Sequence, residues 1–449
     1  MKTKLIAKTA AIALTTFAVA TIMIPEHKHI VVAQKPPQNV ALFKESPKVL
    51  VDDVWQIIYR QYIDDTYNGQ DWMEVRKEYL NRRSYRSKQQ GYAAIREMLE
   101  KLEDPFTRFM NPKEFKALQE NADTAGIGLY VSANKKTKEL VVNSPVEDTP
   151  AYKAGILSGD ILIKIDGKTT QGMNHFNVMN QLRGEAGTPV KLTVRREQKQ
   201  LEFKIVREKI ELRPVSYEVT KTNKGNIGYI RLKQFRGNAS SEMRKAIRDL
   251  EKKQVAGYVL DLRSNSGGLL NSSIEIARMW LNKGTIVSTV DRKGIVKREE
   301  ASGGALINKP LAFNSTNKPL FRKPLSKPAL TNKPLIVIIN DATSSGAEIL
   351  TAALQENNRA TLVGTKTKGY NTIQSVRSLY DGSGLAVTIA KWSTPKGRDI
   401  NNVGISPDVV VNLTPSQQLT MIQNRSFGTM ADPQFSKAVE KLTQLIQKQ

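Results

Sequence analysis

The chain has 449 residues, 40% of them apolar, which suffices for two or three domains with sizeable buried cores and excludes a disordered protein. Its 68 Lys and Arg exceed its 43 Asp and Glu by 25, a balance that favours anionic membrane surfaces and acidic protein partners. The absence of cysteine excludes disulfides and thiolate chemistry, and no zinc-ligand spacing, RNA-binding aromatic motif or basic heptad region indicates a nucleic-acid partner.

The first 24 residues have the layout of a signal peptide. Three lysines lie among the first eight residues, and an apolar run of sixteen residues follows from Thr9 to Ile24, with the small-residue pattern Ala18-Val19-Ala20 inside it. Because a membrane span needs roughly 20 apolar residues, this run favours cleavage near Ala20 over retention as an uncleaved anchor. We therefore predict an exported protein in which residues 25–44 form a polar linker.

Residues 45–120 are predicted to be mostly helical. Ser46 and Pro47 supply an N-cap and a first-turn proline. Apolar side chains then recur at helical spacing in two sets, which are Val51, Val54, Trp55, Ile58 and Tyr62, followed by Tyr92, Ile95, Leu99 and Leu102. Each set lies on one face of its predicted helix.

From Gly126 the pattern changes to short strands. GIGLYVS, ELVVN, ILIKIDGK and TPVKLTVRR read as strands, and NHFNVMNQL reads as a helix that opens with His175. The order of these elements over residues 121–208 resembles a PDZ domain of the circularly permuted bacterial type.

A tail-binding turn is predicted at Gly126-Ile127-Gly128-Leu129. Glycines in such a turn expose backbone N–H groups to a terminal carboxylate, and the adjacent strand edge can pair with an extended peptide. The alternative interpretation is a plain hairpin, in which the glycines serve the backbone alone. His175 is predicted to face a bound peptide or solvent.

Beyond residue 208 strands and helices alternate. The strands NIGYIRL, GYVLDL, PLIVIIN and ATLVG are separated by the helices SEMRKAIRDL, SSIEIARMWL and SGAEILTAALQ. Continuous apolar strands indicate a sheet covered on both faces, so we predict an α/β core over 209–412 and a helical tail over 413–449. Ligands bind such sheets outside the carboxyl ends of the strands, where Asp261-Leu262-Arg263 and residues 340–345 fall.

Residues 308–335 interrupt this alternation with a repeat. Asn-Lys-Pro-Leu occurs at 308, 317 and 332, with related RKPL at 322 and SKPA at 326. Prolines at this density forbid a helix and predict an extended surface insertion. It is either a basic docking loop near the active site or a tolerated repeat expansion, and the pattern favours the expansion.

Ser345 is the candidate nucleophile. It stands where PLIVIIN gives way to a helix, a position where a serine most often serves only as an N-cap. The free N–H groups of that helix, Gly346 first, point toward an oxygen bound beside the serine, and the helix dipole favours negative charge there. A second oxyanion donor is predicted at Gly267 or Gly268, where the backbone can approach a substrate carbonyl without Cβ interference.

The general base is not a histidine. The only histidines are His27, His29 and His175, and there is no HExxH or comparable metal cluster, so we expect neither metal nor other cofactor. What remains is a serine with a lysine base, whose pKa must be lowered by burial to give a neutral amine near pH 7.

Five motifs together resemble the carboxyl-terminal processing (tail-specific) serine proteases, particularly their cyanobacterial and chloroplast members. The resemblance covers residues 45–440 in the order of that family. The motifs are LEDPFTRFMNPKEF, the PDZ-like segment, LDLRSNSGGLL, NDATSSGAEI and TIAKWSTPKGRDINNVGISPDVVV.

The resemblance implies a fold and a function. The expected fold is multidomain, α+β and α/β, with a helical N-terminal region, a PDZ domain and a protease core with a mixed, ClpP/crotonase-like sheet. Ser345 aligns with the family's nucleophile. The implied partners are C-terminal tails of protein substrates, either precursors of photosystem proteins in a thylakoid lumen or periplasmic proteins.

One position departs from the family. Its base lysine, in the pattern Gly-Lys-Gly-x-x-Gln-Ser, falls on Tyr370, while the glutamine that orients that lysine is kept as Gln374. Tyrosine, with a usual pKa of about 10, is a poor base at neutral pH. In an extended segment Lys368 points to the same side, roughly 6.6 Å away along the chain. Two predictions follow: an endopeptidase with Lys368 as base, or a pseudoprotease that binds tails without cleaving them.

Overall fold

The computed structural model describes residues 46–448, except 309–328 and short gaps at 121–124, 134–136, 138, 146–148, 158, 174, 211–212, 223–224, 303–304, 415, 418–419, 422–423 and 425. The predicted signal peptide, the linker and most of the proline-rich insertion therefore lie outside the described residues. Within the described part of the chain, no helix combines the length and the apolar character needed to cross a membrane.

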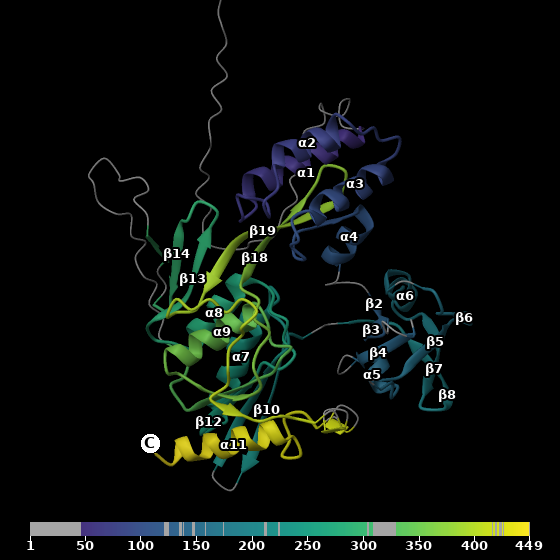
Figure 1. The fold of residues 1–449 in the computed structure, drawn as a ribbon. Coiled ribbons are helices and arrows are strands. Elements are labelled where there is room, and N and C mark those ends of the chain that lie inside the picture. The colour runs from purple at the N-terminus through teal and green to yellow at the C-terminus, as the bar shows by residue number, and fades with distance from the viewer. Residues whose placement is uncertain are drawn as a thin grey trace, which may run out of the picture.

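The N-terminal region contains four helices, α1 (Pro47–Gln61), α2 (Trp72–Leu80), α3 (Lys88–Glu100) and α4 (Pro112–Glu120). The side chain of Asp71 caps α2 by accepting from the amides of Met73 and Glu74. The apolar faces of α1, α2 and α3 form one buried cluster. Strand β1 (Arg108–Met110) leaves this region and pairs with β19 (Gly384–Ser393), so the helices are joined to the core by a sheet (Figure 1).

The PDZ-like region has a hydrophobic cluster of its own. Its main sheet has the order β3-β4-β5-β7-β8, with β6 beside β5, and this leaves β3 at one edge. The elements are β2 (Ala125–Gly126), β3 (Leu129–Ala133), β4 (Leu140–Pro145), α5 (Pro150–Lys153), β5 (Ile161–Ile165), β6 (Lys168–Thr169), α6 (His175–Leu182), β7 (Pro189–Arg196), β8 (Lys199–Val206) and β9 (Glu208–Lys209). Strands β2 and β9 pair where the chain enters and leaves this region.

The core is built on a mixed sheet of order β10-β11-β12-β16-β17-β20. Its strands are β10 (Val215–Thr222), β11 (Gly225–Leu232), β12 (Gly257–Asp261), β16 (Leu335–Ile339), β17 (Thr361–Gly364) and β20 (Val409–Val410). The β10–β11 pair is antiparallel and the other pairs are parallel.

Both faces of this sheet are covered, as its apolar strands predicted. Leu335, Val337 and Ile339 of β16 pack in the cluster with α7 (Ala239–Lys252), α8 (Leu270–Trp280) and α9 (Gly346–Glu356). The alternate residues Ile336 and Ile338 pack against α11 (Pro433–Ile446) on the other face (Figure 1). Side chains that alternate between two buried faces explain why the strand shows no polar alternation.

A second sheet was not anticipated from the sequence. It runs β1-β19-β13-β14-β15, and β18 pairs with β19. The additional strands are β13 (Thr285–Asp291), β14 (Val296–Glu300), β15 (Ala305–Asn308) and β18 (Thr372–Ser378). Leu385 and Val387 of β19 pack in the cluster of the N-terminal helices, so the β18–β19 hairpin connects that cluster to the core.

Candidate active site

The turn 340–345 connects β16 to α9 at the carboxyl ends of the parallel strands. Within it, the hydroxyl of Thr343 donates to the carbonyl of Leu262, 2.9 Å away, and the amide of Ser344 donates to the carbonyl of Asn265 at 3.0 Å. Both acceptors follow β12, so the turn before α9 and the segment after β12 are held side by side. Open parallel sheets bind their ligands at this edge.

Ser345 ends the turn and is the N-cap of α9. Its backbone has φ 53° and ψ −121°. Residues other than glycine rarely adopt this region, and the strain costs about 1–3 kcal/mol. A strained corner between a strand and a helix is the geometry that presents a nucleophilic serine in α/β hydrolases. Ser345 is partly exposed and not packed beneath other residues.

Three glycine positions predicted for the oxyanion hole meet at this corner. A Cβ on Gly267 would lie 2.9 Å from Ser345 Cβ, and one on Gly346 would lie 3.6 Å from the amide nitrogen of Gly268. The amide of Gly267 donates to Asn265 Oδ1 at 2.9 Å and is therefore occupied. Within the described residues, the amides of Gly268 and Gly346 donate to no acceptor. These two N–H groups are free to hold an oxyanion. Gly267 has no side chain, and this allows its backbone to lie close to Ser345 and Gly346.

The candidate base residues lie on the segment beside the turn. The amide of Lys368 donates to the carbonyl of Thr343 at 3.0 Å. The exposed Lys368 side chain places Nζ 5.8 Å from the centroid of the Tyr370 ring. That ring packs edge-on against Phe106, with centroids 5.1 Å apart. Residue 370, on which the resemblance places the base lysine, is thus held against the N-terminal region, and no pattern in the sequence indicates this contact.

Gln374 is not connected to these residues. Its side-chain amide donates to Thr372 Oγ1 at 2.8 Å. A register shift between Ile373 and Gln374 interrupts the pairing of β18 with β19. In the described structure no hydrogen bond joins Gln374 to Lys368 or Tyr370, so the lysine-orienting contact implied by the family pattern is not formed here.

The predicted tail-binding turn lies at the start of edge strand β3. Gly128 has φ 78°, and a Cβ there would lie 2.2 Å from Thr149 Oγ1, so only glycine fits. The side chains of Ile127 and Leu129 are buried in the PDZ-like core, which leaves only their backbone for a peptide. His175 begins α6, the helix beside β3, and its side chain lies outside the described atoms.

Comparison with known proteins identifies the family. The model of peptidase family S41 matches residues 226–411, and that of the PDZ domain matches residues 125–206. A carboxyl-terminal-processing protease of Synechocystis sp. is 37% identical over 406 residues, which cover 89% of this chain and 88% of the relative. The chain belongs to the carboxyl-terminal-processing proteases.

Chloroplast relatives and a solved structure agree with this assignment. The chloroplastic carboxyl-terminal-processing peptidase 2 of Arabidopsis thaliana is 37% identical over 389 residues, covering 84% of this protease and 71% of the relative. The structure of a photosystem II D1 C-terminal processing protease matches with a TM-score of 0.62 and 32% identity, covering 87% and 99% of the two chains. The predicted family, its class as a serine-type peptidase and the multidomain fold with a PDZ domain are confirmed.

Glu348 joins the two halves of the candidate site in this protease. Its fully buried carboxylate accepts from the amides of Ser345 and Tyr370, each at 2.9 Å, from the Gly369 amide at 2.7 Å and from Thr367 Oγ1 at 2.6 Å. Burial raises the pKa of Glu348, while its four donors act in the opposite sense and favour the carboxylate. Glu348 is not among the site residues predicted above, although a serine followed three residues later by glutamate is a capping-box signal.

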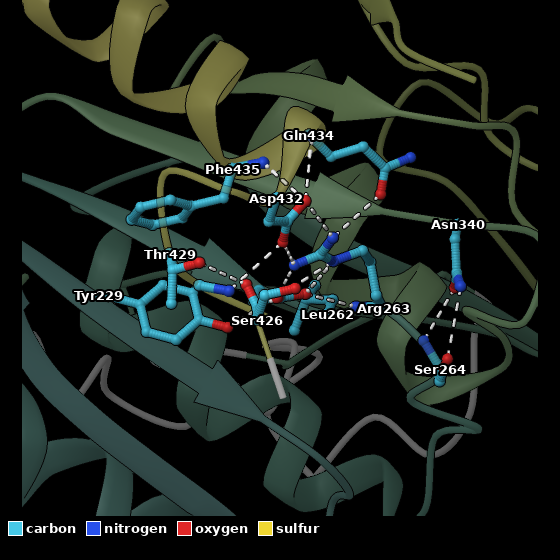
Figure 2. Close-up of polar contacts among 12 residues, drawn as sticks. Tyr229, Leu262, Arg263, Ser264, Asn340, Ser426, Thr429, Asp432, Gln434 and Phe435 are labelled. Atoms are coloured by element: carbon cyan, nitrogen blue, oxygen red, sulfur yellow. Dashed lines mark hydrogen bonds and ion pairs between the residues drawn. The ribbon is translucent and has the colours of Figure 1, made fainter. Parts of the chain in front are cut away.

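A buried ion-pair network around Arg263 joins the end of β12 to the start of α11 (Figure 2). Arg263 Nη2 lies 2.6 Å from Asp432 Oδ2, and Arg263 Nε donates to Asp261 Oδ1 at 3.0 Å. All three side chains are almost fully buried. Although burial acts to raise the pKa of Asp261, the Arg263 charge and hydrogen bonds hold that pKa below its usual value. Because Asp432 caps α11, the network ties that helix to the segment that leads to Gly267.

Proposed function

We propose that this protein is an exported serine endopeptidase that cleaves C-terminal tails captured by its PDZ domain. The observation that carries the proposal is the corner at Ser345. A partly exposed serine with strained backbone stands next to two glycine amides that have no acceptor within the described residues. A serine that served only as a helix cap would need neither the strain nor the free donors.

The chemistry follows from these groups. Ser345 Oγ attacks the scissile carbonyl carbon and gives its proton to the neutral amine of Lys368. The carbonyl oxygen becomes an oxyanion and accepts from the amides of Gly346 and Gly268, which the dipole of α9 assists. The tetrahedral intermediate collapses, the amine product leaves with a proton from Lys368, and water then hydrolyses the acyl-enzyme by the same route.

Lys368 is the proposed base because of its placement. Its backbone is bound to Thr343, two residues from Ser345, and its ammonium lies near the ring that occupies the family's lysine position. A substrate tail lying over Lys368 would remove water from its amine. The neutral amine is the form that accepts the proton of Ser345.

The second candidate function is tail binding without cleavage. Tyr370 supports it, because its ring stands where the family has lysine and is fixed against Phe106. Under this alternative the PDZ domain and the free amides of Gly268 and Gly346 hold a tail, and no group takes the proton of Ser345.

Peptide cleavage separates the two functions. The mature protein is incubated with an unstructured peptide that ends in apolar residues, and Ser345→Ala must abolish any cleavage. If Lys368 is the base, Lys368→Ala lowers kcat at least 100-fold. The matched control Lys366→Ala, an exposed lysine two residues away, leaves kcat within about twofold. Binding of the peptide without cleavage, together with activity created by Tyr370→Lys, would support the pseudoprotease instead.

The edge strand β3 supports tail capture, because an extended peptide can add to it and place its carboxylate near the turn at Gly128. The net charge of +25 supports contact with an anionic membrane surface. The names of the relatives suggest a tail of a photosystem II protein as substrate. A periplasmic protein tail fits the signal-peptide pattern equally well.

A further inference from the structure

The buried side chain of Asn265 lies between the end of β11 and the glycine turn, which comprises Ser266, Gly267 and Gly268. Its Nδ2 donates to the carbonyl of Leu232 at 2.7 Å, and its Oδ1 accepts from the amide of Gly267 at 2.9 Å. Its backbone carbonyl accepts from the amide of Ser344 at 3.0 Å. Asn265 is completely buried, so no solvent can replace these partners. One residue therefore contacts the sheet, the glycine turn and the residue before Ser345.

The two side-chain partners require a neutral amide. The carbonyl of Leu232 can only accept and the amide of Gly267 can only donate, so the side chain between them must offer one donor and one acceptor. An aspartate would set a carboxylate oxygen against the Leu232 carbonyl. A leucine of similar size would leave both backbone groups buried without a partner.

The bond from Gly267 to Asn265 fixes which amide faces Ser345. It turns the N–H of Gly267 toward Asn265. The carbonyl of Gly267 accepts from the amide of Phe235 at 2.9 Å. In a trans peptide the C=O and the next N–H point in opposite directions, so the amide of Gly268 points away from Phe235. Its nitrogen lies on the side of Gly346, and it has no acceptor within the described residues.

We infer that Asn265 is the positioning residue of the oxyanion hole: it holds the Gly267 amide aside and thereby aims the Gly268 amide at the oxygen bound beside Ser345. This inference rests on the proposed function. Asn265 touches neither substrate nor reacting atoms. Its effect on catalysis passes through one backbone amide, so it acts on the transition state more than on the bound substrate.

The test compares Asn265→Leu with Asn357→Leu. Asn357, at the far end of α9, also bonds two backbone carbonyls through its side-chain amide, those of Thr285 and Ala353. Cleavage of the apolar-ended peptide gives kcat and KM, and a peptidyl boronic acid, which forms a tetrahedral anionic adduct on serine, gives Ki. Thermal unfolding is measured for both variants.

Asn265→Leu should lower kcat about 100-fold, the size of losing one oxyanion donor, and leave KM within threefold. Its boronate Ki should weaken by the same factor as kcat/KM. Asn357→Leu should lose thermal stability and keep kcat and Ki within threefold. The inference is overturned if folded Asn265→Leu cleaves within threefold of the parent, or if kcat falls while boronate affinity is unchanged.

The remaining outcomes are also decisive. If Asn265→Leu does not fold, Asn265→Asp replaces it, and its boronate affinity relative to the parent should recover as pH falls, because protonation restores a donor to Leu232; no recovery overturns the inference. If the parent binds the boronate through Ser345 but does not cleave, the proposed endopeptidase fails and Ki alone tests Asn265. If the parent neither cleaves nor binds the boronate, both proposals fail.

Discussion

Replacing Gly267 with alanine would force apart the two segments that form the candidate site. The added Cβ would lie 2.7 Å from Gly346 N, 2.9 Å from Ser344 O and 2.9 Å from Ser345 Cβ. Two of these atoms are backbone and the third is the first side-chain atom of the nucleophile, so none can swing away. Carbon contacts normally lie at about 3.5–4.0 Å, and the segments must therefore separate by about 0.5–1 Å.

This displacement should lower activity more than stability. A misplacement of about 1 Å at a reacting centre costs up to about 100-fold, so we expect kcat/KM of Gly267→Ala to fall about 10- to 100-fold. The positive φ of 91° strains an alanine backbone, which should lower the free energy of unfolding by about 1–2 kcal/mol. Peptide cleavage measures the first effect and urea unfolding the second.

Gly397→Ala is the matched control for the backbone cost. Gly397 has φ 80° and open space where a Cβ would stand. It should lose a similar amount of stability and keep kcat/KM within about twofold. Equal activity in the two folded alanine variants would refute the argument that contact between Gly267 and the Ser345 corner controls catalysis.

Three further variants test other parts of the structure. Tyr370→Phe keeps the ring and should leave kcat within about twofold, whereas a tenfold loss would mean that the phenol transfers a proton. Gly128→Ala places a Cβ 2.2 Å from Thr149 Oγ1 and should weaken tail binding, which is measured by titration with a fluorescent peptide. The reactivity of Ser345 toward a small ester should change little. Because Arg263 holds the pKa of Asp261 below its usual value, their ion pair adds stability above about pH 3.9 that is lost as pH falls through the lower folded pKa. The unfolding free energy between pH 5 and pH 2 should therefore change less in Asp261→Asn than in the parent, and an equal change would contradict this assignment.

The local elements of the core follow from the chain itself. The apolar runs at β12 and β16 predicted a sheet buried on both faces, because side chains alternate between faces and both faces here meet helices. The proline and N-cap at Ser46 and Pro47 predicted the start of α1. The serine at the start of α9 was identifiable because its neighbours repeat a family pattern. These signals involve residues close in sequence.

The sequence determined this protein's family, its PDZ-like strands, and the helices and parallel strands of its core, since periodicity, turn chemistry and contiguous motifs are properties of neighbouring residues. Tertiary structure decided which residues meet. Arg263 pairs with Asp432 across 169 positions, and Phe106 packs on Tyr370 from another region of the chain. The amide of Gly268 is free and that of Gly267 is not, because the buried side chain of Asn265, bound to the end of β11, accepts from Gly267. Such contacts form only when elements far apart in the chain pack together and their buried polar groups find partners. A pattern of neighbouring residues therefore cannot predict them.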